Sequence, residues 1–193
     1  MKMRSSLAVL ALLALGTVSQ AAIETYTIDP VHSSVSFKIR HLVSKVPGKF
    51  TKFSGTITVD RDNLEQSSAE ATIETSSLST DNEKRDNHVR SADFLDANAF
   101  PKITFKSKSW KKTGNDTFDV TGDLTIKDVT KEVVLKVNLL GFGPGMPGTQ
   151  VSGWEANATI NKADFHVKDP PALDPVLGDD VAVMLNIEAG MKK

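Results

Sequence analysis

The side chains best suited to binding chemistry gather in one polar segment near the middle of the chain, residues 80–91. Arg85, His88 and Val89 recur there at positions i, i+3 and i+4, which share one face of a helix. Arg90 follows directly, and His41 ends an alternating run further upstream. A guanidinium fork binds two oxygens of a phosphate or a carboxylate at once. Arg85, His88, Arg90 and His41 are therefore the candidate contacts for the polar head of a ligand.

A structural role is equally open to the two arginines. Arg85 and Arg90 can pair with carboxylates of the same segment and so fasten it to the rest of the fold. The carboxylates concerned belong to Asp86, Asp93 and Asp96. His88 can likewise serve as a hydrogen-bonded spacer. The residue types alone leave both roles open.

Catalytic and metal chemistry find little support in the sequence. The chain has no cysteine, and its four histidines (His32, His41, His88 and His166) lack the spacing of a metal motif. Residues 60–63 begin like a calcium loop but lack its central glycine and final glutamate. The motifs of nucleophile elbows, zinc proteases and phosphate-binding loops are missing. We expect a non-catalytic binding protein without a metal or another cofactor.

Length and composition indicate one exported globular domain. The chain has 193 residues and a formal net charge of −1, which gives no sign of a basic patch that would bind nucleic acid. Lys2 and Arg4 precede an apolar run, residues 7–15, and small residues follow at positions 19 and 21. This pattern predicts a signal peptide, residues 1–21, with cleavage after Ala21 or Ala22, and one domain over residues 22–193. Since no second run of about 20 apolar residues follows, we expect no membrane span.

The elements that must position the candidate residues are strands. Apolar and polar residues alternate with period two in eight stretches, which is typical of half-buried strands. The stretches are residues 35–41, 53–59, 69–73, 103–105, 118–126, 133–139, 154–160 and 181–187. Breaks are expected at residues 46–48 and 141–148, which are rich in glycine and proline. Eight or nine antiparallel strands joined by turns predict a sandwich or a closed up-and-down barrel.

One helical insert, at about residues 81–95, interrupts the strands. Thr80 and Glu83 have the spacing of a capping box, which predicts that the helix begins here. Phe100 precedes Pro101 and so avoids the helical region, which closes the insert. The first ten residues of the insert are almost wholly polar, so this is not an ordinary helix of a protein core.

Several stretches together resemble one family. They are residues 32–37 (HSSVSF), 85–94 (RDNHVRSADF), 101–105 (PKITF), 122–130 (GDLTIKDVT), 161–165 (NKADF) and 178–181 (GDDV). Over essentially all of the chain after the signal peptide, the sequence is similar to the YceI family of periplasmic lipocalin-like polyisoprenoid-binding proteins. The resemblance implies an all-β fold, a lipocalin-like eight-stranded antiparallel β-barrel with a helical segment at one end. It also implies an apolar tunnel for a polyisoprenoid or another long-chain amphiphile, a periplasmic location, links to stress responses and a possible homodimer.

The strand faces supply nine apolar residues as the expected tunnel lining. They are Phe37, Ile39, Phe53, Ile57, Ile103, Phe105, Leu124, Leu135 and Trp154. Patterning alone permits these side chains to fill a solid core as well, and the resemblance favours the tunnel. Family members often carry a tryptophan and an arginine in the loop that corresponds to residues 142–149, where this chain has Phe142 and Met146. If this loop borders the tunnel mouth, the head-group contacts or the ligand should differ.

Three functions are consistent with these features. The first is a periplasmic carrier or scavenger that holds a polyisoprenoid or a fatty-acid-like lipid, with Arg85, His88, Arg90 and His41 near the head group. The second is an enzyme that acts on such a lipid, with His88 as acid or base. The third is a stress or interaction module whose barrel is filled. We favour the first.

Overall fold

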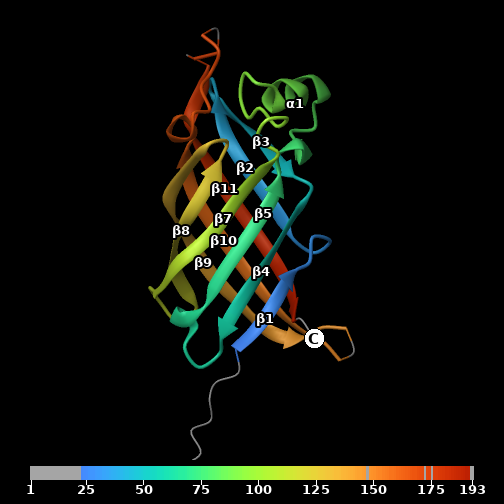
Figure 1. Cartoon of the computed structure of the whole chain (residues 1–193), viewed down its shortest axis with the longest axis vertical. Coiled ribbons are helices and arrows are strands. Elements are labelled where there is room, and N and C mark those ends of the chain that lie inside the picture. The colour runs from blue at the N-terminus through green and yellow to red at the C-terminus, as the bar shows by residue number, and fades with distance from the viewer. Residues whose placement is uncertain (1–22, 147, 172, 175, 192–193) are drawn as a thin grey trace, which may run out of the picture.

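The computed structural model describes residues 23–146, 148–171, 173–174 and 176–191 of the chain. These residues form one closed antiparallel barrel that is long in one direction (Figure 1). The strands are β1 (Ile23–Ile28), β2 (Ser34–His41), β3 (Ser44–Phe50), β4 (Phe53–Asp60), β5 (Ser68–Glu74), β6 (Leu78–Ser79), β7 (Lys102–Lys112), β8 (Thr117–Ile126), β9 (Val129–Pro144), β10 (Gln150–Asn161) and β11 (Leu177–Met191). The helices are η1 (Leu64–Gln66), η2 (Thr75–Ser77), α1 (Glu83–Arg90) and η3 (Lys162–Phe165).

Eleven strand segments make a barrel of eight because three of the long strands are each broken once. β1 and β2 both pair with β11, at Ile28↔Ala189 and at Val35↔Leu185, so they lie end to end along it. β4 pairs with β1 while β3 pairs with β2, and β5 pairs with β4 while β6 pairs with β3. The β1–β11 pairing closes the sheet. The predicted eight-stranded antiparallel barrel is therefore confirmed.

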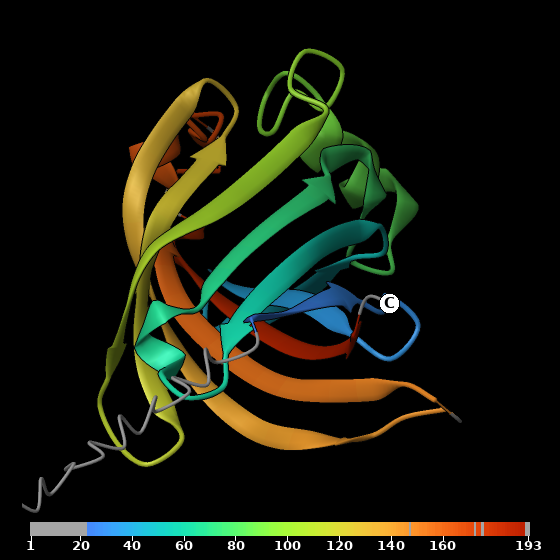
Figure 2. The same ribbon diagram turned by 60° about the horizontal axis from the view of Figure 1, so that its bottom comes forward.

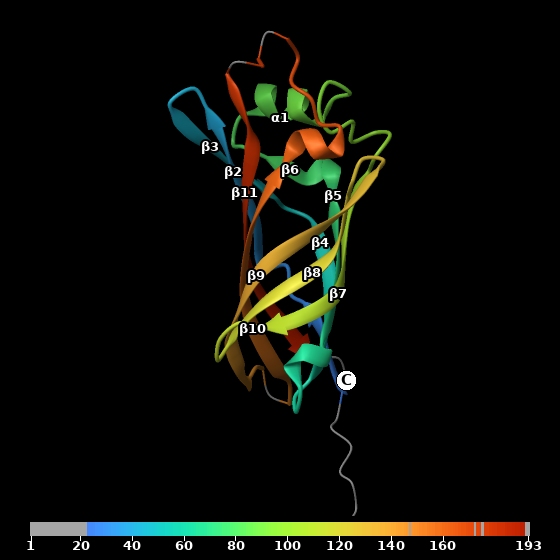
Figure 3. The same cartoon turned by 90° about the vertical axis from the view of Figure 1, so that its left-hand side faces the viewer.

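The interior is packed at both ends. At one end, a cluster of buried side chains that includes Tyr26, Phe118 and Trp154 fills the barrel. At the other end, α1 and η3 cover the barrel, and Leu78, Phe94 and Phe165 are buried beneath them (Figure 3). Between these two clusters, every second side chain of each strand points into the middle of the barrel. Figure 2 shows the curved sheet that surrounds this space.

The helical insert is shorter than predicted and begins differently. α1 covers Glu83–Arg90, and the side chain of Asn82 caps it by accepting a hydrogen bond from the Arg85 amide at 3.0 Å. The expected cap, Thr80, donates its amide and hydroxyl to the Asp86 carboxylate instead. Asp81, between Thr80 and Asn82, has a positive φ of 59°. The predicted capping box of Thr80 and Glu83 is therefore wrong, and Asn82 caps the helix instead.

Both of the predicted strand breaks contain strand residues. Val46, Pro47 and Gly48 belong to β3, where Pro47 is opposite Lys38 of β2. Proline is tolerated there because β3 pairs with β6 only at Lys49 and Phe50. Pro47 has no strand beside it on that side and occupies an edge position. Similarly, β9 continues to Pro144 because Gln150 and Val151 of β10 pair with its last residues. The glycine-rich stretch is a strand end followed by a short loop.

The predicted signal peptide, residues 1–21, and its cleavage site lie outside the described residues. Among the residues that are described, none of the helices has the length and apolar character needed to cross a bilayer.

Candidate functional site

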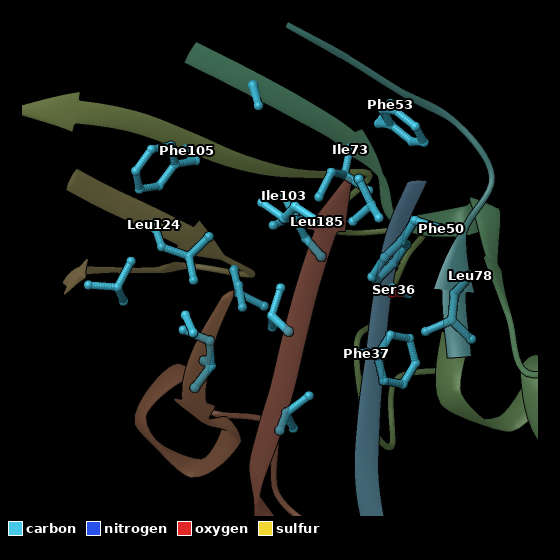
Figure 4. Close-up of a pocket in the computed structure, with 18 of the residues that line it drawn as sticks. Ser36, Phe37, Phe50, Phe53, Ile73, Leu78, Ile103, Phe105, Leu124 and Leu185 are labelled. Atoms are coloured by element: carbon cyan, nitrogen blue, oxygen red, sulfur yellow. The ribbon is translucent and has the colours of Figure 1, made fainter. Parts of the chain in front are cut away.

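The barrel encloses an apolar cavity of about 500 Å³, within the range of pockets that hold small molecules. Its wall comes from nearly every strand, and Figure 4 shows Phe37, Phe105 and Leu185 facing the same space from different strands. All nine residues predicted as tunnel lining border this cavity: Phe37, Ile39, Phe53, Ile57, Ile103, Phe105, Leu124, Leu135 and Trp154. The inward faces of the strands therefore surround a space rather than meeting throughout the barrel.

An aromatic cluster forms the floor of the cavity. Trp110 and Trp154 border the cavity and pack edge to face, with ring centroids 5.6 Å apart. Phe118 lies against Trp110 and is almost completely buried. The indole N–H of Trp154 donates to Ser152 Oγ at 3.0 Å, and that of Trp110 to Ser107 Oγ at 3.3 Å. Because these donors have partners within the protein, the floor presents rings rather than polar groups.

Phe142 belongs to this closed end. Its ring lies 5.8 Å from the Tyr26 ring and 5.9 Å from the Trp154 ring, centroid to centroid, and the Arg61 guanidinium stacks on its face at 3.7 Å. Neither Phe142 nor the described residues of the loop after it border the cavity. The expectation that this loop bears on the head group therefore has no basis in the geometry: Phe142 supports the floor from outside.

Polar side chains gather at the opposite end of the cavity, which we call the polar end. It comprises His41, Thr80, Arg85, His88 and Lys162, all of which border the cavity. Arg85, His88 and Val89 share one face of α1, as their spacing predicts, and all three border the cavity. Among the acidic residues, Glu70 also borders the cavity beside Gly55, but its carboxylate is 60% exposed and pairs with Lys106 at 2.7 Å.

Arg85 is held by Thr80 rather than by a carboxylate. Its Nε donates to Thr80 Oγ1 at 2.7 Å, and Nη2 donates to the Thr80 carbonyl at 2.8 Å. These bonds use two of its five N–H donors. His88 Nε2 lies 2.9 Å from Asp93 Oδ2, and its ring packs edge to face on Phe94. Both side chains are thus oriented by neighbours while they border the cavity.

Arg90 lies apart from the polar end. It does not border the cavity, and its guanidinium donates to the carbonyls of Asp86 and Ser76 and to the Asn87 side chain. This is the structural role that the sequence left open, although the acceptors are carbonyl and amide oxygens. The bond to Ser76 joins α1 to the η2 segment beside the barrel.

The Asp86 carboxylate is the buried acid that anchors this helix. Burial raises its pKa, but the amide and hydroxyl of Thr80 donate to the carboxylate and the charge of Arg90 lies nearby. These interactions outweigh burial, so the pKa of Asp86 is below its usual value. The carboxylate stays charged and joins α1 to the turn that precedes it.

Lys162 is the cavity residue that sequence reasoning missed. Its side chain is 7% exposed, and Nζ lies 2.9 Å from Asp169 Oδ2 and 2.7 Å from Asp179 Oδ1. Burial lowers the pKa of the ammonium, but the hydrogen bonds with both carboxylates raise it by more than burial lowers it. The pKa of Lys162 is therefore above its usual value. The signal was present in the alternation, because Trp154, Ile160 and Lys162 have the same parity. The predicted lining of that face contains only apolar residues and therefore does not include Lys162.

The four histidines do not assemble into one metal site. His41 and His88 border the cavity, whereas His166 Nδ1 lies 3.4 Å from Asp128 and His32 Nδ1 lies 2.8 Å from Asp29. Across the described part of the chain, the one group with three possible ligand atoms close together consists of Asp29, His32 and Glu188. It lies outside the cavity, and the hydrogen bond from His32 already lowers the pKa of Asp29.

Comparison with known proteins agrees with this geometry. The family model described as "YceI-like domain" matches residues 26–189. Protein YceI of Escherichia coli is 38% identical over 180 residues, which cover 92% of each chain. The crystal structure of BcnA from Burkholderia cenocepacia superposes with a TM-score of 0.74 at 26% identity, over 84% of this chain and 99% of that one. A polyisoprenoid binding domain from Saccharophagus degradans has the same fold, with a TM-score of 0.66 at 15% identity over 86% and 98% of the two chains.

Proposed function

This chain belongs to the family of YceI-like domains, and on that premise we propose that it binds a long-chain amphiphile, a polyisoprenoid or a fatty-acid-like lipid, with the tail inside the barrel. The observation that carries the proposal is the apolar cavity of about 500 Å³, closed by rings at one end and bordered by cations at the other. An amphiphile has the same division into an apolar tail and a polar head. The similar fold of the structure described as a polyisoprenoid binding domain from Saccharophagus degradans supports the proposal.

The affinity for the tail would increase with the number of methylenes that the apolar wall can bury. On β11, four alternating lining residues run from Val181 to Ile187, which is about 20 Å along the strand at roughly 3.3 Å per residue, and Leu177 extends the lining further. Each buried methylene contributes about 0.8 kcal/mol. Ten methylenes would give about 8 kcal/mol, against an association cost of about 4–15 kcal/mol. Short amphiphiles should therefore bind weakly and long ones tightly.

The head group would meet Arg85, His88, His41 and Lys162 at the polar end. Arg85 is the best candidate for direct contact because its position is fixed by Thr80 and part of its donor fork is unused. Arg90, which was expected to contact the head group, would instead hold α1 in place through its bond to the Ser76 carbonyl. An anionic or oxygen-rich head fits this set of donors.

In the cell, the protein would act as a carrier or scavenger rather than as an enzyme. The predicted signal peptide supports a periplasmic setting, where a water-soluble protein that shields an alkyl tail is needed. His88 is paired with Asp93, which orients its ring beside the cavity. Binding alone accounts for the site.

A chain-length series tests the proposal. The affinity of the purified protein for amphiphiles with one head group and increasing tails is measured by calorimetry. Affinity should rise about fourfold per methylene, which is 0.8 kcal/mol, and level off when the tunnel is full. Affinity that is independent of tail length would contradict binding in the tunnel. Arg85→Met should weaken the binding of all members of the series by a similar factor. Arg90→Met, which changes a side chain outside the cavity, should not cause this uniform loss of affinity.

A further inference from the structure

The hairpin formed by β2 and β3 concentrates positive charge in a chain that is otherwise acidic. Residues 30–59 contain five of the 23 lysines and arginines and none of the 24 acidic residues. The five are Lys38, Arg40, Lys45, Lys49 and Lys52. Lys49 pairs with Asp81 at 3.5 Å, and Lys52 pairs with Glu74 at 3.4 Å. The ion pairs formed by the described residues include neither Lys38 nor Lys45.

Two of these cations face each other across the strands. Arg40 of β2 is directly opposite Lys45 of β3, and like charges in such positions destabilise a sheet. The Arg40 guanidinium donates to the carbonyls of Leu42 and Leu177, and its charge lies near that of Asp179, which Lys162 also engages. The ion pairs of the described residues include neither Arg40 nor Lys45, and an anionic surface would relieve the repulsion between them.

The tip of the same hairpin exposes two apolar side chains. Val43 is fully exposed, and Leu42 is 55% exposed. Leu42 adopts a positive φ of 51°, an unfavourable conformation for this residue, and its amide donates to the Val176 carbonyl at 2.8 Å. The turn is thus held in a defined shape that presents both side chains to solvent. Figure 3 shows the hairpin projecting from the barrel at the end that carries α1.

The inner side of this hairpin is part of the cavity wall. Phe37, Ile39, His41 and Val46 border the cavity, whereas Lys38 and Arg40 have the opposite parity on β2. The exposed tip therefore lies beyond His41, at the polar end of the cavity. A surface that engages the tip would be next to the site of the head group.

We propose that the β2–β3 hairpin docks this protein on the surface of an anionic lipid bilayer. Leu42 and Val43 enter the head-group region, while Lys38, Arg40 and Lys45 lie among the phosphates. Apolar insertion and electrostatic attraction are each weak here, and together they give reversible binding. If the function proposed above is correct, an amphiphile would pass between bilayer and tunnel with little of its tail exposed to water.

Vesicle flotation tests the docking. Full-length mature protein is mixed with vesicles of phosphatidylcholine, with and without phosphatidylglycerol. Binding should require phosphatidylglycerol and should weaken strongly as salt approaches about 1 M, where the screening length is about 3 Å. Lys45→Glu and Val43→Asp should each reduce binding. Loss of one cation should cost about fivefold, and Lys45→Glu, which changes the charge by two units, should cost more than that. Equal binding to both kinds of vesicle, or binding that both substitutions leave unchanged, would overturn the proposal.

Matched controls lie at the closed end of the barrel. Met146 is 79% exposed, and Lys111 is exposed near the end of β7. Met146→Asp and Lys111→Glu make the same chemical changes far from the hairpin and should leave flotation intact. If they reduce binding as much as the hairpin variants do, the docking site is wrong. Thermal unfolding of each variant shows whether it is folded.

Uptake of a short, water-soluble amphiphile separates this proposal from the tunnel proposal. Docking with no uptake would leave the hairpin assignment standing and remove the ligand-binding function. Uptake without docking would do the reverse. Val43→Asp should reduce flotation while it leaves uptake of the soluble amphiphile unchanged.

Discussion

A bulky side chain halfway along the tunnel should shorten the tail that the protein can hold. Along β10 and into the start of η3, the cavity is bordered from Trp154 at the floor to Lys162 at the polar end, and Ala158 lies midway between them. Ala158→Phe places a ring in the cavity, whereas Asn157→Phe places the same ring on the exposed outer face of the strand. The first variant should therefore close the deeper half, and the second should leave the tunnel open.

The magnitude depends on how much of the tail is displaced. Ala158 and Trp154 are four positions apart, which is about 13 Å of strand. For every five buried methylenes that a tail loses, its binding free energy falls by about 4 kcal/mol, or roughly three orders of magnitude in affinity. Tails short enough to end before Ala158 should bind as they do to the unmodified protein.

The assay is a titration of a long and a short amphiphile with one head group into both variants. In Ala158→Phe, the long tail should fall to the affinity of the short one, while Asn157→Phe should bind both normally. Equal affinities of the two variants for the long tail would refute the assignment of the tail to this cavity. Thermal melting of Ala158→Phe, compared with the unmodified protein, shows that the barrel is intact.

The remaining predictions concern stability. Gly55→Ala should lower the free energy of unfolding by about 1–3 kcal/mol in urea titrations, because a Cβ there meets the backbone of β5, whereas Gly143→Ala, with open space around it, should cost much less. Lys162→Met should cost about 3–5 kcal/mol by leaving the buried Asp169 carboxylate without its partner, and adding Asp169→Asn should recover part of this loss; equal stability of the single and double variants would contradict the buried pair. The folded pKa of Asp86 is lowered, so its contribution is present above the unfolded pKa and is lost as pH falls through the lower folded pKa. The protection of the α1 amides, relative to their intrinsic exchange rates at the same pH, should accordingly fall below about pH 3.8, the ordinary pKa of this aspartate. Asp86→Asn should remove this dependence; an acid response that persists in this variant would assign the effect to another group.

Much of the barrel follows from local pattern. Phe37, Ile57 and Leu124 could be placed on the cavity wall because period-two alternation fixes which side chains share a face. The shared face of Arg85 and His88 followed in the same way from helical spacing. Both are short-range geometric properties, so the sequence is sufficient to predict them.

The features that were missed depend on pairing between distant segments. Pro47 is accepted in β3 because β6, more than 25 residues later, pairs with only the end of that strand. Phe142 could not be assigned to the closed end without knowing that β9 and β10 continue past the floor. Lys162 was overlooked for a different reason: a charge on an inward position is accepted when Asp169 and Asp179 compensate it, and these residues lie on other segments.

The most direct test of the tunnel proposal is identification of the molecule that the protein carries. The mature protein is purified from its host without detergent, its native mass is measured, and the bound material is extracted and identified. We expect a mass increment equal to one long-chain amphiphile, which is released on denaturation. A ligand-free mass, together with no uptake of isoprenoids or fatty acids on incubation, would show that the cavity does not serve to hold a tail.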